Sequence, residues 1–284
     1  MAKKSVFDFF EMKRKGERIT WLTAYDYPMA VLEEQAGIDM ILVGDSAGMV
    51  VYGYSGTLPM TMEQMISHTQ AVRRGAPNVF LIGDMPFLSY HKSVEDSIYN
   101  AGRFYKEAGV DAIKLEGGKR VTPKIRAIVD AGMVVIGHIG LTPQSTAALG
   151  GFKPQGNTAE TAIILVEDAK AVQEAGASML LVEAVPPETT KIIWETLRIP
   201  VLSIGAGPYC DGQVLIVSDM LGLFEVFTPK FVKKYANLAD IIRAAIKEYV
   251  KEVREGTFPT LEHCYRMKAG EPEKLEAMLK KKTR

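Results

Sequence analysis

The stretch Lys106-Glu-Ala-Gly109-Val-Asp-Ala-Ile-Lys-Leu-Glu116 contains a helix end, a glycine stop and a short apolar run. A glycine just past a helix adopts a positive φ without the steric cost of a Cβ atom. The nearly continuous apolar run that follows is typical of a strand buried on both faces of a parallel sheet. This segment therefore predicts a junction at which a helix leads into the next buried strand.

The same junction recurs along the chain. The other copies span Glu34–Asp45, Val129–His138 and Gln173–Glu183. Further apolar runs predict strands at residues 19–25, 79–82 and 201–204, with a less distinct candidate at 223–227. Together these segments make about eight strands, the number found in a (β/α)8 barrel.

Helical signals lie between most of these strands. Thr61 and Gln64 are spaced as in a capping box, and residues 158–175 carry apolar side chains at helical spacing. No Pro-, Gly- or Ser-rich linker divides the chain. The alternation of strands and helices favours a single (β/α)8 TIM barrel, of class α/β, over a doubly wound sheet. We expect residues 1–266 to form the catalytic barrel domain and residues 267–284 to form a solvated C-terminal tail.

The composition excludes several classes of protein. The 284 residues include 34 Lys and Arg against 34 Asp and Glu, and 47% of them are hydrophobic, which excludes general disorder. A balanced charge gives no overall attraction to nucleic acid or to an anionic membrane. No apolar stretch approaches the length of a membrane helix. With Cys210 and Cys264 as the only cysteines, no disulfide framework is indicated, and we expect a cytoplasmic protein.

Polar side chains stand where the predicted strands end. In such barrels the active site lies at the carboxyl ends of the strands. In chain order these positions are Asp26, Asp45 and Ser46, Asp84, Lys114 and Glu116, His138, and Glu183. One polar residue at a strand end can simply mark where burial stops. Because the series continues over successive strands that converge on one mouth, we interpret it as a shared site.

Three of these residues predict a cation site. Asp45, Asp84 and Glu116 would repel one another, and a hard divalent cation would relieve that repulsion. Oxygen ligands suit Mg²⁺, with Mn²⁺ as an alternative, whereas zinc prefers His or Cys. Lys114 lies two residues before Glu116, so both side chains can face the barrel interior. Its ammonium could neutralise a substrate carboxylate, or it could form an ordinary inward ion pair.

The remaining strand-end residues leave alternatives open. Glu183 follows an apolar strand and fits either a general base or a fourth metal ligand. His138 lies between two glycines, where it could touch substrate or serve only the structure. Asp211 could cap a helix as a structural residue. The glycines around Gly44 to Gly56 form neither a dinucleotide fingerprint nor a phosphate loop.

Several strings resemble those of the ketopantoate hydroxymethyltransferase family. They are Gly44–Tyr54, Thr57–Met62, Gly83–Phe87, Ile113–Gly117, Gly137–Gln144, Ile204–Gly207 and Asp211–Leu215. Each glycine-rich string alone is a weak signal, but their number and order are specific. The resemblance extends from about Phe7 to Arg266 and leaves only the tail unmatched.

This resemblance implies a barrel of the phosphoenolpyruvate/pyruvate-binding type. It implies transfer of a hydroxymethyl group from 5,10-methylenetetrahydrofolate to 3-methyl-2-oxobutanoate through a Mg²⁺-stabilised enolate, giving 2-dehydropantoate in pantothenate biosynthesis. The implied roles are one Mg²⁺ per subunit on Asp45, Asp84 and Glu116, substrate contacts from Asp45, Ser46, Asp84 and Lys114, and proton acceptance by Glu183. A cytoplasmic homo-oligomer, commonly a homodecamer, is also implied.

Two other functions remain as alternatives. A Mg²⁺-dependent lyase that cleaves a carbon–carbon bond in a 2-oxo or 2-hydroxy acid would use the same carboxylates. A barrel that only binds a metabolite is disfavoured, because every expected site residue is present. For the folate, Tyr25, Phe87 and Tyr209 are candidates to stack on the pterin ring, although core packing is the commoner use of such residues.

Overall fold

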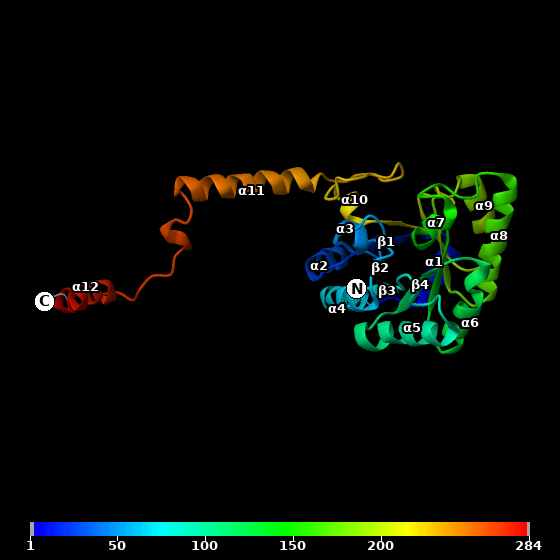
Figure 1. The fold of residues 1–284 in the computed structure, drawn as a ribbon, viewed down its shortest axis with the longest axis horizontal. Helices are drawn as coiled ribbons and strands as arrows, with labels where there is room; N and C mark the ends of the chain where they lie inside the picture. The colour runs from blue at the N-terminus through cyan, green and yellow to red at the C-terminus, as the bar shows by residue number, and fades with distance from the viewer. Residues whose placement is uncertain (1–2, 283–284) are drawn as a thin grey trace. The chain divides into compact units, whose positions relative to one another are not determined.

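The computed structural model describes residues 3–282, in which eight parallel strands close into a barrel (Figure 1). Each strand pairs with the next along the chain, and β8 returns to pair with β1. The strands are β1 Ile19–Thr23, β2 Met40–Val43, β3 Phe80–Asp84, β4 Ala112–Glu116, β5 Val135–Gly140, β6 Met179–Glu183, β7 Val201–Ile204 and β8 Gly212–Leu215. The predicted (β/α)8 barrel is therefore confirmed.

Helices follow most of the strands and surround the barrel (Figure 1). The α-helices are α1 Val6–Lys15, α2 Tyr27–Ala36, α3 Ala47–Val50, α4 Met62–Gly75, α5 Val94–Ala108, α6 Thr122–Asp130, α7 Thr146–Leu149, α8 Ala159–Glu174, α9 Pro187–Thr196, α10 Val217–Met220, α11 Leu238–Glu255 and α12 Glu271–Lys282. Three 3₁₀ turns are η1 Lys119–Val121, η2 Pro143–Ser145 and η3 Leu261–His263. The junction glycines Gly37 and Gly109 end α2 and α5 with φ of 83° and 64°, as the repeated motif predicts.

The core has two layers, as the burial of both strand faces requires. Side chains such as Trp21, Met40 and Ile82 fill the barrel interior. Alternate strand residues pack outward against the helices, in a layer that includes Phe104 of α5. A Cβ atom on Gly83 would lie 2.5 Å from the Phe104 ring, so a glycine is needed for this close approach of helix and strand.

The eighth strand lies elsewhere than predicted. Residues 223–227 form no strand, and β8 is instead Gly212–Leu215, paired with β1 and β7. No helix precedes β8, because residues 205–211 connect it directly to β7, so the helix-to-strand motif is missing there. Gly212 lies so close to β1 that a Cβ atom would be 2.4 Å from the Ile19 carbonyl oxygen.

The prediction that Asp211 caps a helix is wrong, although its role is structural. Its carboxylate accepts hydrogen bonds from Lys13 Nζ, Trp194 Nε1 and the Val201 backbone N–H, each at 2.8 Å. Asp211 thereby joins α1, α9 and β7 at the start of β8.

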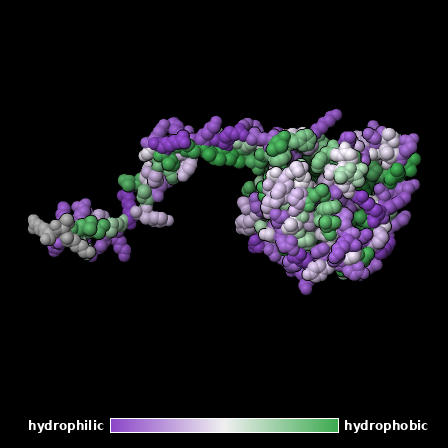
Figure 2. Space-filling model, in the orientation of Figure 1, coloured by the Kyte–Doolittle hydropathy of each residue, from purple (hydrophilic) through white to green (hydrophobic). Residues whose placement is uncertain are grey.

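The chain divides into two compact units, one extending to Ala236 and the other starting at Asn237. The second unit contains α11, whose apolar residues share one side of the helix (Figure 2). It also contains α12, within the segment expected to be a solvated tail. The extent of the catalytic domain, residues 1–266, stays a prediction. No helix within residues 3–282 combines the length and apolar character needed to cross a membrane.

Candidate active site

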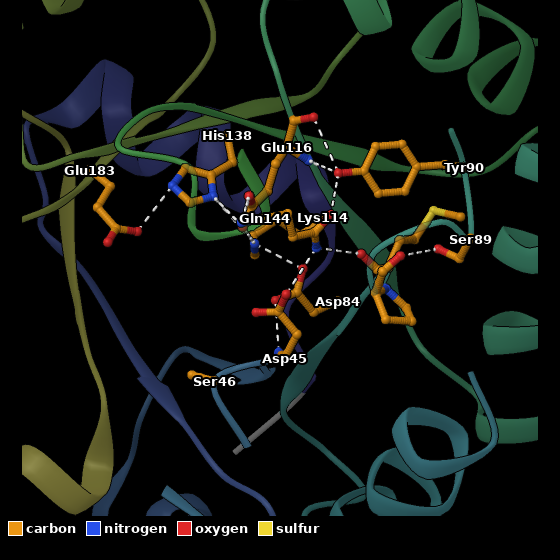
Figure 3. Close-up of polar contacts among 12 residues, drawn as sticks. Asp45, Ser46, Asp84, Ser89, Tyr90, Lys114, Glu116, His138, Gln144 and Glu183 are labelled. Atoms are coloured by element: carbon orange, nitrogen blue, oxygen red, sulfur yellow. Dashed lines mark hydrogen bonds and ion pairs between the residues drawn. The ribbon is translucent and has the colours of Figure 1, made fainter. Parts of the chain in front are cut away.

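The carboxyl ends of β2 to β6 bring six of the predicted site residues into one cavity of about 340 Å³ (Figure 3). They are Asp45, Asp84, Lys114, Glu116, His138 and Glu183. All but Glu183 are buried, with exposed fractions of 3% or less. Ser46 also lines the cavity, and its Oγ lies 2.8 Å from the Tyr25 hydroxyl oxygen. The sequence-based interpretation of a shared site agrees with this convergence.

Each of the three predicted metal ligands has one carboxylate oxygen held by a donor from the protein. Asp84 Oδ2 accepts a hydrogen bond from the Asp45 backbone N–H at 3.0 Å. Gln144 donates to the other two carboxylates. Its backbone N–H donates to Glu116 Oε2 and its Nε2 donates to Asp45 Oδ2, both at 2.9 Å. These contacts fix the carboxylates and leave Asp84 Oδ1 and Glu116 Oε1 without hydrogen bonds.

Lys114 points at those two oxygens. Its Nζ lies 2.8 Å from Asp84 Oδ1 and 3.5 Å from Glu116 Oε1. Burial opposes the charge on Lys114, but the neighbouring carboxylates outweigh burial and raise its pKa well above the usual range. The inward ion pair, one of the two alternatives for this lysine, is thus present, while its contact with substrate stays a prediction.

His138 lies between two carboxylates. Its Nδ1 is 3.4 Å from Glu116 Oε1 and its Nε2 is 3.1 Å from Glu183 Oε2. Burial and the charge of Lys114 disfavour protonation, but the contacts with Glu116 and Glu183 prevail and raise the pKa of His138 to about 9. Its Nδ1 also lies 3.3 Å from Lys114 Nζ, so the imidazole connects both carboxylates and the ammonium in one buried network.

The cavity contains more negative than positive charge. Burial, followed by the charges of Asp84 and Glu116, raises the pKa of Asp45 well above its usual range. Burial also raises the pKa of Asp84. Burial acts in the same direction on Glu116, but Lys114, His138 and the Gln144 N–H together outweigh it, and the pKa of Glu116 is lowered. Five carboxylates line the cavity, those of Asp45, Asp84, Glu116, Glu183 and Asp219, against the three lysines Lys114, Lys153 and Lys230 and the imidazole of His138.

A hard divalent cation fits this set of donors. Asp45, Asp84 and Glu116 offer carboxylate oxygens only, and a divalent charge would balance the excess. Within residues 3–282, no three His, Cys, Asp or Glu side chains stand as a preformed metal site. Lys114 Nζ instead pairs with Asp84 Oδ1 and faces Glu116 Oε1, two of the oxygens that such an ion would use.

Gln144 and Tyr90 belong to the site and were not singled out by sequence reasoning (Figure 3). The Tyr90 hydroxyl donates to Gln144 Oε1 at 2.7 Å and accepts from the Glu116 backbone N–H at 3.1 Å. With Oε1 occupied in this way, Gln144 Nε2 is directed at Asp45 and at the Met85 carbonyl oxygen. The available signal was the position of Gln144, shortly after the strand that contains His138.

Some expected residues lie elsewhere. Asp26 is exposed and caps α2 by accepting a hydrogen bond from the Met29 N–H, and it does not line the cavity. Tyr25, Phe87 and Tyr209, the candidates for stacking on a pterin, are also absent from the cavity lining. The aromatic side chains that do line it are Phe152, Phe224, Phe227 and Phe231.

Comparisons with known proteins place the chain among hydroxymethyltransferases. A sequence model of the ketopantoate hydroxymethyltransferase family matches residues 3–261. A curated relative from Alkaliphilus metalliredigens (strain QYMF), named 3-methyl-2-oxobutanoate hydroxymethyltransferase, is 64% identical over 263 residues, covering 93% of each chain. A relative of the same name from Moorella thermoacetica (strain ATCC 39073 / JCM 9320) is 55% identical over 255 residues, covering 90% of this chain and 95% of the relative.

Solved structures of low sequence identity share the fold. Phosphonopyruvate hydrolase in complex with oxalate and Mg²⁺ aligns with a TM-score of 0.60 and 16% identity, covering 99% of this chain and 98% of the other. The 2,3-dimethylmalate lyase, a member of the PEP mutase/isocitrate lyase superfamily, also aligns with a TM-score of 0.60 and 16% identity, covering 96% and 98%. These structures share the barrel fold of this chain.

Proposed function

The chain belongs to the ketopantoate hydroxymethyltransferase family and is an enzyme of the transferase class; on that premise we propose that its donor is 5,10-methylenetetrahydrofolate and its acceptor 3-methyl-2-oxobutanoate. The products are 2-dehydropantoate and tetrahydrofolate. The observation that carries this proposal is the convergence of Asp45, Asp84, Lys114, Glu116 and Glu183 on one cavity. The lyase alternative lacks comparable support, since the curated relatives are named as transferases.

We propose that Asp45, Asp84 and Glu116 hold one Mg²⁺ per subunit. Support comes from the all-oxygen donor set, from the excess negative charge around it, and from a complex with Mg²⁺ described for a protein of the same fold. When bound, the ion would act as a Lewis acid toward the oxygens of the 2-oxo acid.

The substrate carboxylate lies against the Lys114 ammonium, with Asp45, Ser46 and Asp84 forming the adjoining wall. Lys114 is suited to this role because it is buried and cationic, so its charge is weakly screened by water. This charge favours the negative charge that develops on the keto oxygen as the reaction proceeds.

Glu183 removes the proton from C3 of the oxo acid. Its carboxylate lies at the end of β6, partly exposed to the cavity, and His138 Nε2 lies 3.1 Å from its Oε2. The methylene carbon of the folate is bonded to two nitrogens. The enolate carbon bonds to this methylene carbon as the first carbon–nitrogen bond breaks, and the hydroxyl group of water bonds to it as the second breaks. The proton from C3 and the remaining proton of water go to the two folate nitrogens, which gives tetrahydrofolate.

The proposal also includes the cellular setting. We place the enzyme in the cytoplasm as a homo-oligomer, with a homodecamer as the expected assembly. The two free cysteines, Cys210 and Cys264, are compatible with a reducing compartment.

An assay of 2-dehydropantoate with and without 5,10-methylenetetrahydrofolate, each with added Mg²⁺, tests the proposed reaction. Product is expected only when folate, oxo acid and Mg²⁺ are all present. Cleavage of a 2-oxo or 2-hydroxy acid without any folate-dependent product would favour the lyase alternative.

A further inference from the structure

Asp219 is a buried carboxylate without a partner. It lies on α10, after β8, and only 5% of its surface is exposed. Among residues 3–282, no donor forms a hydrogen bond with its side chain and no cation forms a salt bridge with it; the charge of Lys234 opposes the rise in its pKa that burial causes, without outweighing it. Asp211, equally buried, accepts three hydrogen bonds. Buried carboxylates are normally paired, so an unpartnered one needs an explanation.

The position of Asp219 suggests that its partner is a ligand, because this residue lines the same cavity as the predicted catalytic residues. The buried Tyr25 hydroxyl, hydrogen-bonded to Ser46, lies near both Asp219 and Asp45. Burial, together with the charges of these two carboxylates, raises the pKa of Tyr25. Asp219 is therefore next to the substrate-binding wall of the cavity.

The apolar part of the cavity that Asp219 lines favours a flat ligand. Phe224, Phe227 and Phe231 line this cavity, as do Met49 and Val50. Aromatic faces of this kind pack against planar rings, and a few polar groups set the orientation of the ring. A carboxylate in this position would repel an anionic 2-oxo acid, so Asp219 is suited to a second ligand that presents hydrogen-bond donors.

We propose that Asp219 anchors the pterin ring of the folate co-substrate, its two oxygens accepting hydrogen bonds from the adjacent ring N–H and amino groups. The pyrimidine edge of a reduced pterin presents these two donors side by side, which matches the two acceptor oxygens of a carboxylate. The phenylalanines would cover the faces of the ring. This inference rests on the proposed function, since it assigns a subsite for the folate of that reaction.

The test separates folate recognition from the chemistry of the oxo acid. Exchange of the C3 proton of 3-methyl-2-oxobutanoate into D₂O requires no folate, whereas formation of 2-dehydropantoate does. The Asp219→Asn variant should raise the KM for 5,10-methylenetetrahydrofolate by about 10- to 100-fold, the range for a lost hydrogen bond to a charged group. The ratio of folate-free exchange to hydroxymethyl transfer should rise by a similar factor. Asp26→Asn, which changes an exposed aspartate outside the cavity, is the matched control and should change neither quantity.

The possible results distinguish an Asp219 that anchors the pterin from one that does not. An unchanged folate KM in Asp219→Asn would overturn it. If both exchange and transfer fall, equilibrium titration with tetrahydrofolate and with 3-methyl-2-oxobutanoate decides. Loss of tetrahydrofolate binding alone supports the anchor, and loss of both ligands overturns it. A wild-type enzyme that exchanges the proton but never transfers the hydroxymethyl group would contradict the proposed function, a failure distinct from an unchanged folate KM in the variant.

Discussion

Nε2 of His138 lies 3.1 Å from Oε2 of Glu183, although the two side chains come from different strands. The register of the sheet explains this contact. Glu183 of β6 is paired with Gly140 of β5, and His138, two residues earlier in β5, points to the same side as position 140. The pairing of β5 with β6 therefore fixes this contact. Through His138, it links the proposed base Glu183 to the buried Glu116.

His138 should support catalysis by orienting Glu183 through this contact. Replacing it by Gln keeps a polar side chain but removes the imidazole. We expect His138→Gln to slow C3 proton exchange of 3-methyl-2-oxobutanoate by about 10- to 100-fold, within the range for loss of a preorganised electrostatic contact. The measurement is deuterium incorporation followed by NMR, with His263→Gln, in the second unit, as the control. An exchange rate equal to that of wild type would exclude this role.

Gln144 should control metal affinity without being a ligand. Its Nε2 holds Asp45 Oδ2, and its backbone N–H holds Glu116 Oε2. Gln144→Met keeps the length of the side chain and removes the donor to Asp45. Outer partners of metal ligands typically contribute about 10- to 100-fold in affinity, and we expect a loss of this size in a calorimetric Mg²⁺ titration. Gln70→Met, outside the cavity, should bind Mg²⁺ as wild type does, and equal affinity in the two variants would contradict the prediction.

Glu33 should make the stability of the barrel decrease as the pH rises. This residue of α2 is buried, and neither carboxylate oxygen has a hydrogen-bond partner. Burial, aided by the charge of Asp26, raises its pKa from 4.5 to about 8. Between these values the folded state keeps the proton that the unfolded state releases. The free energy of unfolding therefore falls with pH, by up to about 1.4 kcal/mol per pH unit.

The Glu33→Gln variant should remove this dependence. Compared with wild type, its free energy of unfolding should be similar near pH 4.5 and should exceed that of wild type increasingly up to pH 8. Urea unfolding at several pH values measures the difference. Parallel pH profiles for the two proteins would show that Glu33 does not carry the effect.

Local patterns predicted much of the barrel, because the motif of a helix end, a glycine and a buried strand occurs four times. Gly37 and Gly109 adopt the positive φ values that this motif requires. β8 was missed because it follows β7 without an intervening helix. It is also only four residues long. Its position depends on the close approach of Gly212 to β1, a tertiary contact that no local pattern encodes.

Some residues of the candidate site could likewise be predicted from the sequence, and others could not. Strand-end charges such as Asp84 and Lys114 could be identified from the sequence, since their location follows from the barrel. Gln144 and Asp219 could not, because their importance depends on what surrounds them in three dimensions. Gln144 connects two carboxylates that lie far apart in the sequence, Asp45 and Glu116. Asp219 is as buried as Asp211 but lacks the hydrogen bonds that Asp211 accepts.

Proton exchange at C3 of 3-methyl-2-oxobutanoate, measured by NMR in D₂O with Mg²⁺ and without folate, tests the central assignment of Glu183 as the base. We expect the wild-type enzyme to exchange this proton. In Glu183→Gln the rate should fall by about 10²- to 10⁴-fold, the usual contribution of a general base. If the variant is folded by circular dichroism and exchanges the proton as fast as wild type, Glu183 is not the base.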